Sequence, residues 1–377
     1  DGIIGDVAAR HLSFAGNQPD DVSTIRLDSG PAAAEQLESL ATLRRFAYSA
    51  EVGTILGQCR LAMGEYEKAA ESFAQVARDA PNHDLADDAV SGWVEALHLN
   101  GDHDDVVSLA RQAVSQWAPS PLRERVELFW GLSEMSRGQD NEAARRFAGM
   151  IETYPGGVFP QRAFLLLAQC EQRVGSLDDA VQHYNAVLKG NDKSFVPHAL
   201  LGLGTILVQQ GQPQRGGPLL DRLISEFPDS PQITAAQFYR ARASFDSGEY
   251  NGALKRFGQV TTEDGAFADA SAYWVAKCHL RLGDHAEAAT LLKTAAGRFP
   301  DSPLLPEMYY DRAVALVQAA EYEAAAQVLS TYRDRFPDHA MSMDGLHLAA
   351  VAAHHLGRYD ESREQCRAFL SGGRIDT

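Results

Sequence analysis

The sequence predicts an all-α protein, a right-handed α-solenoid (superhelix) of about nine helix-turn-helix repeats. The first observation behind this prediction is a short phrase, often Gly-Glu-Tyr or Gly-Asp-His, that recurs at steps of 35 to 37 residues. The second is that small and bulky residues occupy fixed positions within each step. A constant period of this length is typical of solenoids, in which each repeat packs only on its neighbours.

The recurring phrase starts at an anchor residue, which we place at position fifteen of each repeat. Each repeat is predicted to contain two helices, A and B, joined by the turn that carries the anchor. Eight anchors are glycines and one is an alanine: Gly64, Gly101, Gly138, Gly175, Gly211, Gly248, Gly283, Ala320 and Gly357.

Two positions of the repeat hold almost only small residues, which allows two helices to approach closely. The eighth position holds Gly57, Val94, Gly131, Ala168, Gly204, Ala241, Ala276, Ala313 and Ala350. The twentieth holds Ala69, Val106, Ala143, Ala180, Gly216, Ala253, Ala288, Ala325 and Ser362. Four residues later a bulky residue follows in most repeats, and this i, i+4 alternation predicts a packed seam between helices.

A proline closes several repeats, because proline disfavours helix at the residue before it and fits the first turn of the next helix. These prolines are Pro81, Pro155, Pro228, Pro300 and Pro337. The pattern resembles the tetratricopeptide repeat (TPR) over roughly residues 50–374. The sequence departs from that family in its longer repeats, in Gly265 at one closing position, and in Cys366 where an aromatic residue is usual.

The chain divides into an irregular start, the repeats and a short tail at 375–377. Residues 1–49 do not fit the register, although 3–15 and 31–46 look helical and 16–30 read as a polar loop. We expect a helical cap on the first repeat, with a tether as the alternative. We also expect a bend within 190–218, where the closing proline is missing and Gly216, Gly217 and Pro218 should make helix B start late or kink.

The composition argues against several classes of function. A net charge of −17 disfavours nucleic acid as the partner. The sequence contains no run of 18 apolar residues, so it predicts no membrane span. The sequence has no phosphate-binding loop, HExxH motif or nucleophile elbow, so we expect no enzyme activity, cofactor or catalytic residue. His347 and His354 are too far apart on one helix to form a metal site.

The resemblance implies where a partner binds, because in TPR proteins the second, fifth, ninth and twelfth positions of helix A line the concave groove. In the middle repeats these positions combine apolar, aromatic and basic residues, whereas the first two repeats are polar and acidic there. Arginine and aromatic residues are common interface anchors, so an apolar, acidic peptide or helix is the expected partner. Some of these side chains could instead pack between neighbouring A helices. The predicted groove residues are Arg125, Leu128, Leu132, Arg162, Leu165, Leu201, Phe238, Arg242, Phe245, Tyr273, Lys277 and Tyr310.

The function that this sequence predicts is a non-enzymatic scaffold that holds a partner protein in its groove. The Phe-Pro-Asp-Ser-Pro closures and Gly-Glu-Tyr turns resemble those of bacterial cell-envelope TPR proteins, such as the lipoprotein of the outer-membrane β-barrel assembly machine and the Tol-Pal coordinator. That resemblance implies a periplasmic or envelope assembly. A cytosolic adaptor, or the binding portion of a longer chain with an enzymatic domain elsewhere, remains an alternative. The oligomeric state is left open.

Overall fold

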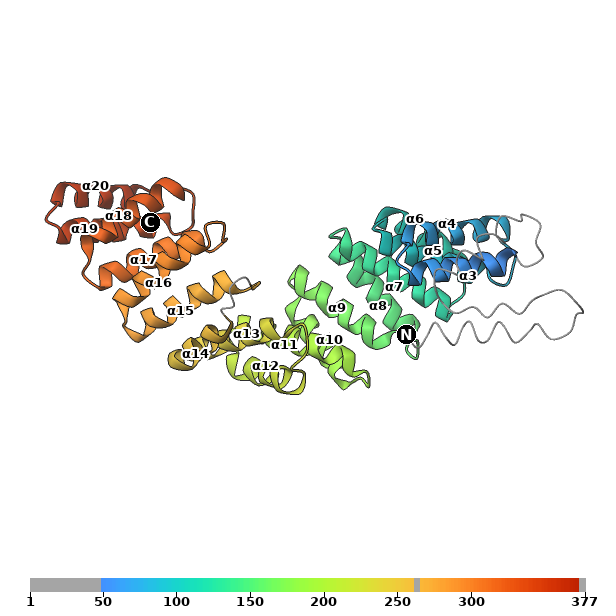
Figure 1. The fold of residues 1–377 in the computed structure, drawn as a ribbon. Coiled ribbons are helices and arrows are strands. Elements are labelled where there is room, and N and C mark those ends of the chain that lie inside the picture. The colour runs from blue at the N-terminus through green and yellow to red at the C-terminus, as the bar shows by residue number, and fades with distance from the viewer. Residues whose placement is uncertain (1–48, 261–264, 373–377) are drawn as a thin grey trace, which may run out of the picture. The chain divides into compact units, whose positions relative to one another are not determined.

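The computed structural model describes residues 49–260 and 265–372, which form an all-α solenoid without any strand in those ranges (Figure 1). The predicted helices at 3–15 and 31–46, and the tail at 375–377, lie outside the described residues. The first helix of each repeat belongs to a series of A helices: α3 (Ser49–Ala62), α5 (Ala86–Asn100), α7 (Pro121–Ser136), α9 (Pro160–Val174), α11 (Val196–Gln209), α13 (Ile233–Asp246), α15 (Ala268–Leu282), α17 (Leu305–Gln318) and α19 (Ser342–His355).

The second helix of each repeat packs against the A helix before it and, in repeats with a described successor in the same compact unit, against the A helix after it. One short 3₁₀ helix, η2 (Lys193–Phe195), precedes α11. The B helices are α4 (Tyr66–Asp79), α6 (His103–Gln116), α8 (Asp140–Thr153), α10 (Leu177–Lys189), α12 (Pro213–Glu226), α14 (Tyr250–Val260), α16 (His285–Arg298), α18 (Tyr322–Arg335) and α20 (Tyr359–Gly372).

All nine anchors adopt positive φ, which explains why the turn between A and B favours glycine. The eight anchor glycines have φ between 72° and 92°, and Ala320 has φ of 62°. Glycine populates this left-handed region without the steric penalty that a Cβ atom brings. The turns therefore lie where the sequence predicts them, and the eighth repeat makes the same turn with an unfavourable residue.

The small positions are buried where A and B helices meet, as predicted. Ala143, Ala180 and Ala253 are completely buried. In the first repeat the ring of Phe73 is sandwiched, because an added Cβ would come within 2.7 Å of it at Gly57 on α3 and within 2.6 Å at Gly92 on α5. A bulky residue of helix B thus fills the space between two successive A helices, which is the packing that a solenoid needs.

Helix B of the fifth repeat does not start late, so that expectation was wrong. α12 begins at Pro213, two residues after its anchor as in the other repeats, and continues through Gly216, Gly217 and Pro218. Packing explains the glycines: a Cβ at Gly216 would lie 2.7 Å from the carbonyl oxygen of Gly204 on α11. The close approach of α11 and α12 therefore outweighs the poor helix propensity of this sequence.

The chain forms two compact units, residues 1–190 and 191–377. Described residues of the first unit comprise α3 to α10, and those of the second comprise η2 and α11 to α20. The boundary falls at the start of the segment 190–218 in which we expect a bend. The bend itself remains a prediction, and residues 191–194 at the boundary are exposed.

Candidate functional site

The A helices carry the predicted partner-binding positions, and the structure separates these positions into two groups. The fifth position is buried in most repeats, whereas the second, ninth and twelfth are mostly half-buried. The fifth position is therefore mainly part of the interior. We call the surface formed by the second, ninth and twelfth positions the A-helix surface.

Five of the twelve predicted groove residues are buried in the structure, so these side chains pack inside the repeats, and their contact with a partner remains a prediction. Buried aromatic side chains pack tightly here: the ring of Phe238 stacks on Phe267 at 4.8 Å and meets Phe257 edge-on at 5.6 Å. Helix B and the turn that leads to the next A helix enclose such side chains: Phe257 belongs to α14, and Phe267 immediately precedes α15. The five buried residues are Leu128, Leu165, Phe238, Phe245 and Tyr273.

Seven predicted residues are half-buried and keep part of their side chain on the surface. Whether they contact a partner remains a prediction. Three belong to the first unit and four to the second: Arg125, Leu132 and Arg162, then Leu201, Arg242, Lys277 and Tyr310.

In the first unit one carboxylate, Glu95, pairs with Arg125 and influences Arg162. Arg125 on α7 donates a hydrogen bond to Glu95 on α5, and its side chain is 40% exposed. Burial lowers the pKa of the Arg162 guanidinium on α9, and the nearby charge of Glu95 acts in the opposite direction. No hydrogen bond or ion pair joins Arg162 to another residue of the described ranges. Glu95 thus bonds Arg125 and also influences the nearby Arg162, and we call these three residues the α5–α7–α9 site.

A neutral histidine borders this site. Burial, together with the charges of His103 and Arg162, lowers the pKa of His98 to about 4. The Nδ1 atom of His98 lies 2.8 Å from the Ser133 hydroxyl on α7, so the imidazole is held by a hydrogen bond. At neutral pH it adds no charge, and the α5–α7–α9 site keeps a net positive charge.

In the second unit Arg242 on α13 is engaged within the chain. Its guanidinium carbon lies 3.6 Å from the centre of the Trp274 ring on α15, and its Nη2 atom lies 3.7 Å from the Asp246 carboxylate. Stacking on an indole and a nearby carboxylate both stabilise the cation. Arg242 is therefore a poorer receptor for an external carboxylate than its position in the sequence suggests.

Lys277 is also paired internally. It donates a 2.8 Å hydrogen bond to Asp311 on α17, and the Tyr273 hydroxyl donates a second one of 2.6 Å to the same oxygen. Burial, followed by the Asp311 charge, raises the pKa of Tyr273. The lysine charge is thus largely compensated at a nearly buried carboxylate.

Sequence reasoning missed three residues that contact the predicted groove cations. Glu95 bonds Arg125, Asp311 bonds Lys277, and the Trp274 ring stacks on Arg242. Glu95 occupies the ninth position of its repeat and Arg125 the second position of the next. Once the register is known, these positions can be tested for opposite charges across neighbouring A helices. Asp311 and Trp274 occupy the sixth position, which the groove pattern does not include.

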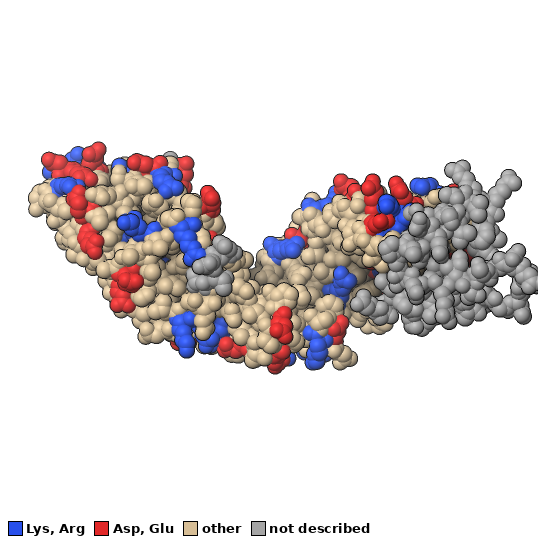
Figure 2. Space-filling model, in the orientation of Figure 1, with Lys and Arg blue, Asp and Glu red and all other residues tan. Residues whose placement is uncertain are grey.

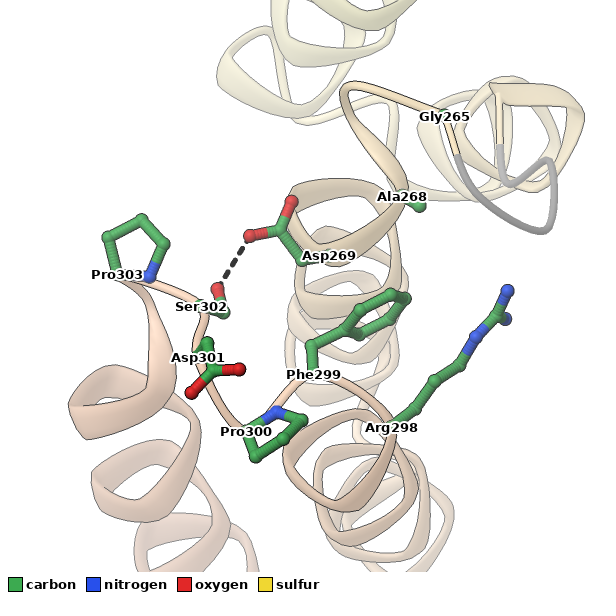
Figure 3. Close-up of a pocket in the computed structure, with 9 residues that line it drawn as sticks. All are labelled: Gly265, Ala268, Asp269, Arg298, Phe299, Pro300, Asp301, Ser302 and Pro303. Atoms are coloured by element: carbon green, nitrogen blue, oxygen red, sulfur yellow. Dashed lines mark hydrogen bonds between the residues drawn. The ribbon is translucent and has the colours of Figure 1, made fainter.

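Two cavities lie at the repeat-closing turns rather than on the A-helix surface. The larger has a volume of about 400 Å³ and is lined by the turn at 299–303 and the start of α15. Figure 3 shows the Ser302 hydroxyl pointing to Asp269, to which it donates a 2.6 Å hydrogen bond. The second, about 390 Å³, is lined by the equivalent turn at 227–231. The Ser302–Asp269 contact joins the closing turn at 299–303 to the start of α15.

The described residues offer few other kinds of site. No cluster of three or more histidine, cysteine, aspartate or glutamate side chains within them could hold a metal ion. Within the same ranges, no helix has both the length and the apolar character to cross a membrane. On the part of the surface that Figure 2 leaves uncovered by grey atoms, acidic and basic side chains form small separate groups among other residues.

The fold and the repeated seam define a helical-repeat protein that presents a surface to partners. Tetratricopeptide repeat family models match residues 165–231 and 238–303, 283–347, and 54–83. The chain belongs to the tetratricopeptide repeat family. Proteins of this family are typically non-enzymatic interaction scaffolds. A search of curated proteins found no match to the chain.

Solved structures with the same fold have low sequence identity to the chain. A tetratricopeptide repeat protein from Parabacteroides merdae is 18% identical with a TM-score of 0.50, and the match covers 71% of this chain and 99% of that one. PilW, described as a type IV pilus biogenesis factor, is 14% identical with a TM-score of 0.51 over 59% and 98% of the two chains. A chain of the APC/C hetero-tetramer Cut9–Hcn1 is 15% identical with a TM-score of 0.49; the match covers 85% of the present chain and 58% of that chain.

Proposed function

We propose that this protein-interaction scaffold binds an acidic segment of a partner protein at the α5–α7–α9 site. The observation that carries the proposal is that Glu95 pairs with Arg125, whereas the half-buried Arg162 nearby has no ion-pair partner among the described residues. Arginine is well suited to this role, since its planar guanidinium binds carboxylates with two parallel hydrogen bonds and stays protonated even when partly buried.

The half-buried position of Arg162 favours a role in binding a partner over a role in keeping the protein soluble. Arg162 has lost part of its hydration, as the lowered pKa of its guanidinium indicates. A carboxylate from a partner would restore that lost stabilisation in surroundings where charge interactions are less screened than in water. Leu132 and Met135, half-buried on α7, supply apolar surface on the same A-helix surface. The partner segment should therefore combine an acidic residue with apolar neighbours.

The acidic residue of the partner would bind in the first unit only. In the second unit Arg242 and Lys277 already pair with Asp246 and Asp311. The half-buried residues of that unit, including Tyr310, would contribute apolar and aromatic contacts to a partner instead.

We further propose that the partner belongs to a bacterial envelope assembly and that this protein lies in the periplasm. The support is the resemblance of its closing turns to those of envelope TPR proteins. The likeness to PilW concerns the fold alone. Cell fractionation of a tagged protein expressed from its native gene tests the placement, and recovery in the cytosolic fraction would favour a cytosolic adaptor.

Site-specific photo-crosslinking tests the binding proposal. A photoreactive phenylalanine analogue at Leu132 should crosslink a partner, whereas the same analogue at Arg145, 75% exposed on α8, should not. The Arg162→Ala change should reduce the Leu132 crosslink by about tenfold. Equal crosslinking from both positions, or no effect of Arg162→Ala, would show that the partner binds elsewhere.

A further inference from the structure

A second pair of arginines lies on two B helices, which the proposed function does not use. These helices, α6 and α8, both pack on α7 in the first unit (Figure 1). The guanidinium carbon of Arg146 on α8 lies over the Trp130 ring of α7, 3.3 Å from the ring centre. Arg146 is half-buried, and its Nε atom is buried without a hydrogen-bond partner. The indole thus holds this cation in one place, and no ion pair joins Arg146 to another residue of the described ranges.

Two buried carboxylates of α7 influence Arg146 but are paired with other arginines. Glu127 accepts a 2.9 Å hydrogen bond from Arg123, and Glu134 accepts a 2.8 Å hydrogen bond from Arg137. Burial lowers the pKa of the Arg146 guanidinium, and the charges of Glu127 and Glu134 act in the opposite direction. Because each carboxylate already has an arginine of its own, Arg146 can accept a further anion.

The register of the repeats brings a second arginine, Arg111 on α6, to the same place. Arg111 occupies the twenty-fifth position of its repeat, and Trp130 occupies the seventh position of the next. In the second unit these two positions hold Asp221 and Arg240, whose side chains form a 2.8 Å hydrogen bond. The equivalent position of Arg111 is therefore next to Trp130 and the guanidinium that lies over it. In agreement, the charge of Arg111 contributes to the lowered pKa of Arg146.

We propose that Arg111 and Arg146 together bind a carboxylate group that comes from outside the chain. The second unit indicates the chemistry, because a carboxylate at the twenty-fifth position, Asp221, there pairs with an arginine of the next repeat. The first unit carries Arg111 at that position, so two guanidinium groups face each other. A carboxylate between them can accept hydrogen bonds from both and reduces their mutual repulsion. Arg111 is exposed, so the site is open to an acidic side chain as well as to a small organic acid.

NMR spectroscopy of the arginine side chains in the full chain tests the proposal. The probes are succinate and the acetylated, amidated pentapeptide Ala-Ala-Glu-Ala-Ala, and the neutral control carries glutamine in place of glutamate. Both arginine signals should shift with one dissociation constant, on the order of 1–10 mM for a single carboxylate. The signal of Arg222, which pairs with Glu226 on α12, should stay in place. Equal shifts at Arg222, shifts with the neutral peptide, or no shift with either acid would overturn the proposal.

The two acidic probes distinguish the sources of the carboxylate. Succinate that binds several times more tightly than the peptide would support a small organic acid, and the peptide binding at least as tightly would support an acidic side chain. Arg162→Ala should leave the Arg111 and Arg146 shifts unchanged, because Arg162 belongs to the α5–α7–α9 site. The two sites can therefore fail independently. Arg111→Gln should weaken the response of Arg146 by about fivefold or more.

The Arg111→Asp variant tests the geometry of the site, because it reproduces the pairing of Asp221 with Arg240. The new carboxylate should pair with Arg146, so the variant should melt at a higher temperature than Arg111→Asn, its neutral counterpart. The Arg146 signal of Arg111→Asp should also no longer respond to succinate or to the acidic peptide. A lower melting temperature than that of Arg111→Asn, or an unchanged response of Arg146, would overturn the proposed site.

Discussion

Lys277 on α15 donates a 2.8 Å hydrogen bond to Asp311 on α17, and thereby links two successive A helices of the second unit. The Asp311 side chain is 10% exposed, so its charge depends on this lysine and on the Tyr273 hydroxyl for stabilisation. The sequence pattern assigns Lys277 to partner binding, which remains a prediction, and the contact gives it a structural role as well.

Replacing Lys277 should therefore destabilise the fold. Lys277→Ala leaves a nearly buried carboxylate with one fewer donor, and we expect a loss of about 1–3 kcal/mol in the free energy of unfolding. Chemical denaturation measures this loss. Lys293→Ala, on the exposed face of α16, is the control and should change the free energy by less than about 0.5 kcal/mol. Equal effects of the two variants would contradict the assigned role.

A substitution at Ala320, the anchor of the eighth repeat, should stabilise the fold. Ala320 adopts φ of 62°, a conformation that costs a residue with a Cβ atom about 1 kcal/mol relative to glycine. Ala320→Gly should therefore raise the free energy of unfolding by about that amount, and Gly283→Ala, at φ of 90°, should lower it similarly. Thermal melting checks both, and shifts of the same sign would show that backbone strain at the anchor is not what the substitutions change.

Two helical glycines should respond in opposite directions to alanine. A Cβ at Gly216 would press against the Gly204 carbonyl, so Gly216→Ala should cost about 1–3 kcal/mol through overpacking of α11 and α12. A Cβ at Gly258 on α14 meets nothing within 4 Å, so Gly258→Ala should gain about 0.5–1 kcal/mol in helix stability. If denaturant unfolding shows Gly216→Ala to be neutral, α11 and α12 are not as close as described.

The neutral state of His98 should make the first unit sensitive to acid. Its folded-state pKa of about 4 lies below the usual value of 6.5, so the unfolded chain takes up a proton first as pH falls. The stability that neutral His98 contributes is complete above pH 6.5 and is lost progressively between pH 6.5 and 4. Between pH 7 and 5 the loss should be about 1–2 kcal/mol.

The His98→Gln variant isolates this effect from the titration of other groups, since glutamine can bond Ser133 but does not titrate. Unfolding free energies of both proteins at pH 7 and 5 give the comparison. The variant should lose less stability than the wild type on acidification. An equal loss in both would mean that His98 is not the responsive group.

The sequence was sufficient to predict the helical repeats because their determinants are local. Anchors such as Gly64 and Gly357 require positive φ, and residues such as Ala253 sit at helix contacts that every repeat makes. The helix at 213–226 was harder, because the approach of Gly216 to Gly204 outweighs local propensity. The contact depends on how two helices pack, whereas helix propensity describes each helix alone.

The candidate site was predicted only in outline for a related physical reason. The pattern identifies the A-helix positions but not which side chains of helix B and of the following turn pack over them, and such contacts with Phe257 and Phe267 bury Phe238. Charge compensation depends on cross-helix pairs such as Arg125 with Glu95, which come from different repeats. The buried aromatic anchors of the predicted groove are therefore core residues.

The measurement that tests the binding account most directly is the affinity of the purified partner for Glu95→Gln and Arg162→Ala. If Glu95 competes with the partner for the arginines, Glu95→Gln should tighten binding by about threefold or more, and Arg162→Ala should weaken it by about tenfold. Arg145→Ala, which removes an arginine from α8, should have no effect. Weaker or unchanged binding to Glu95→Gln would contradict the claim that the α5–α7–α9 site receives a carboxylate.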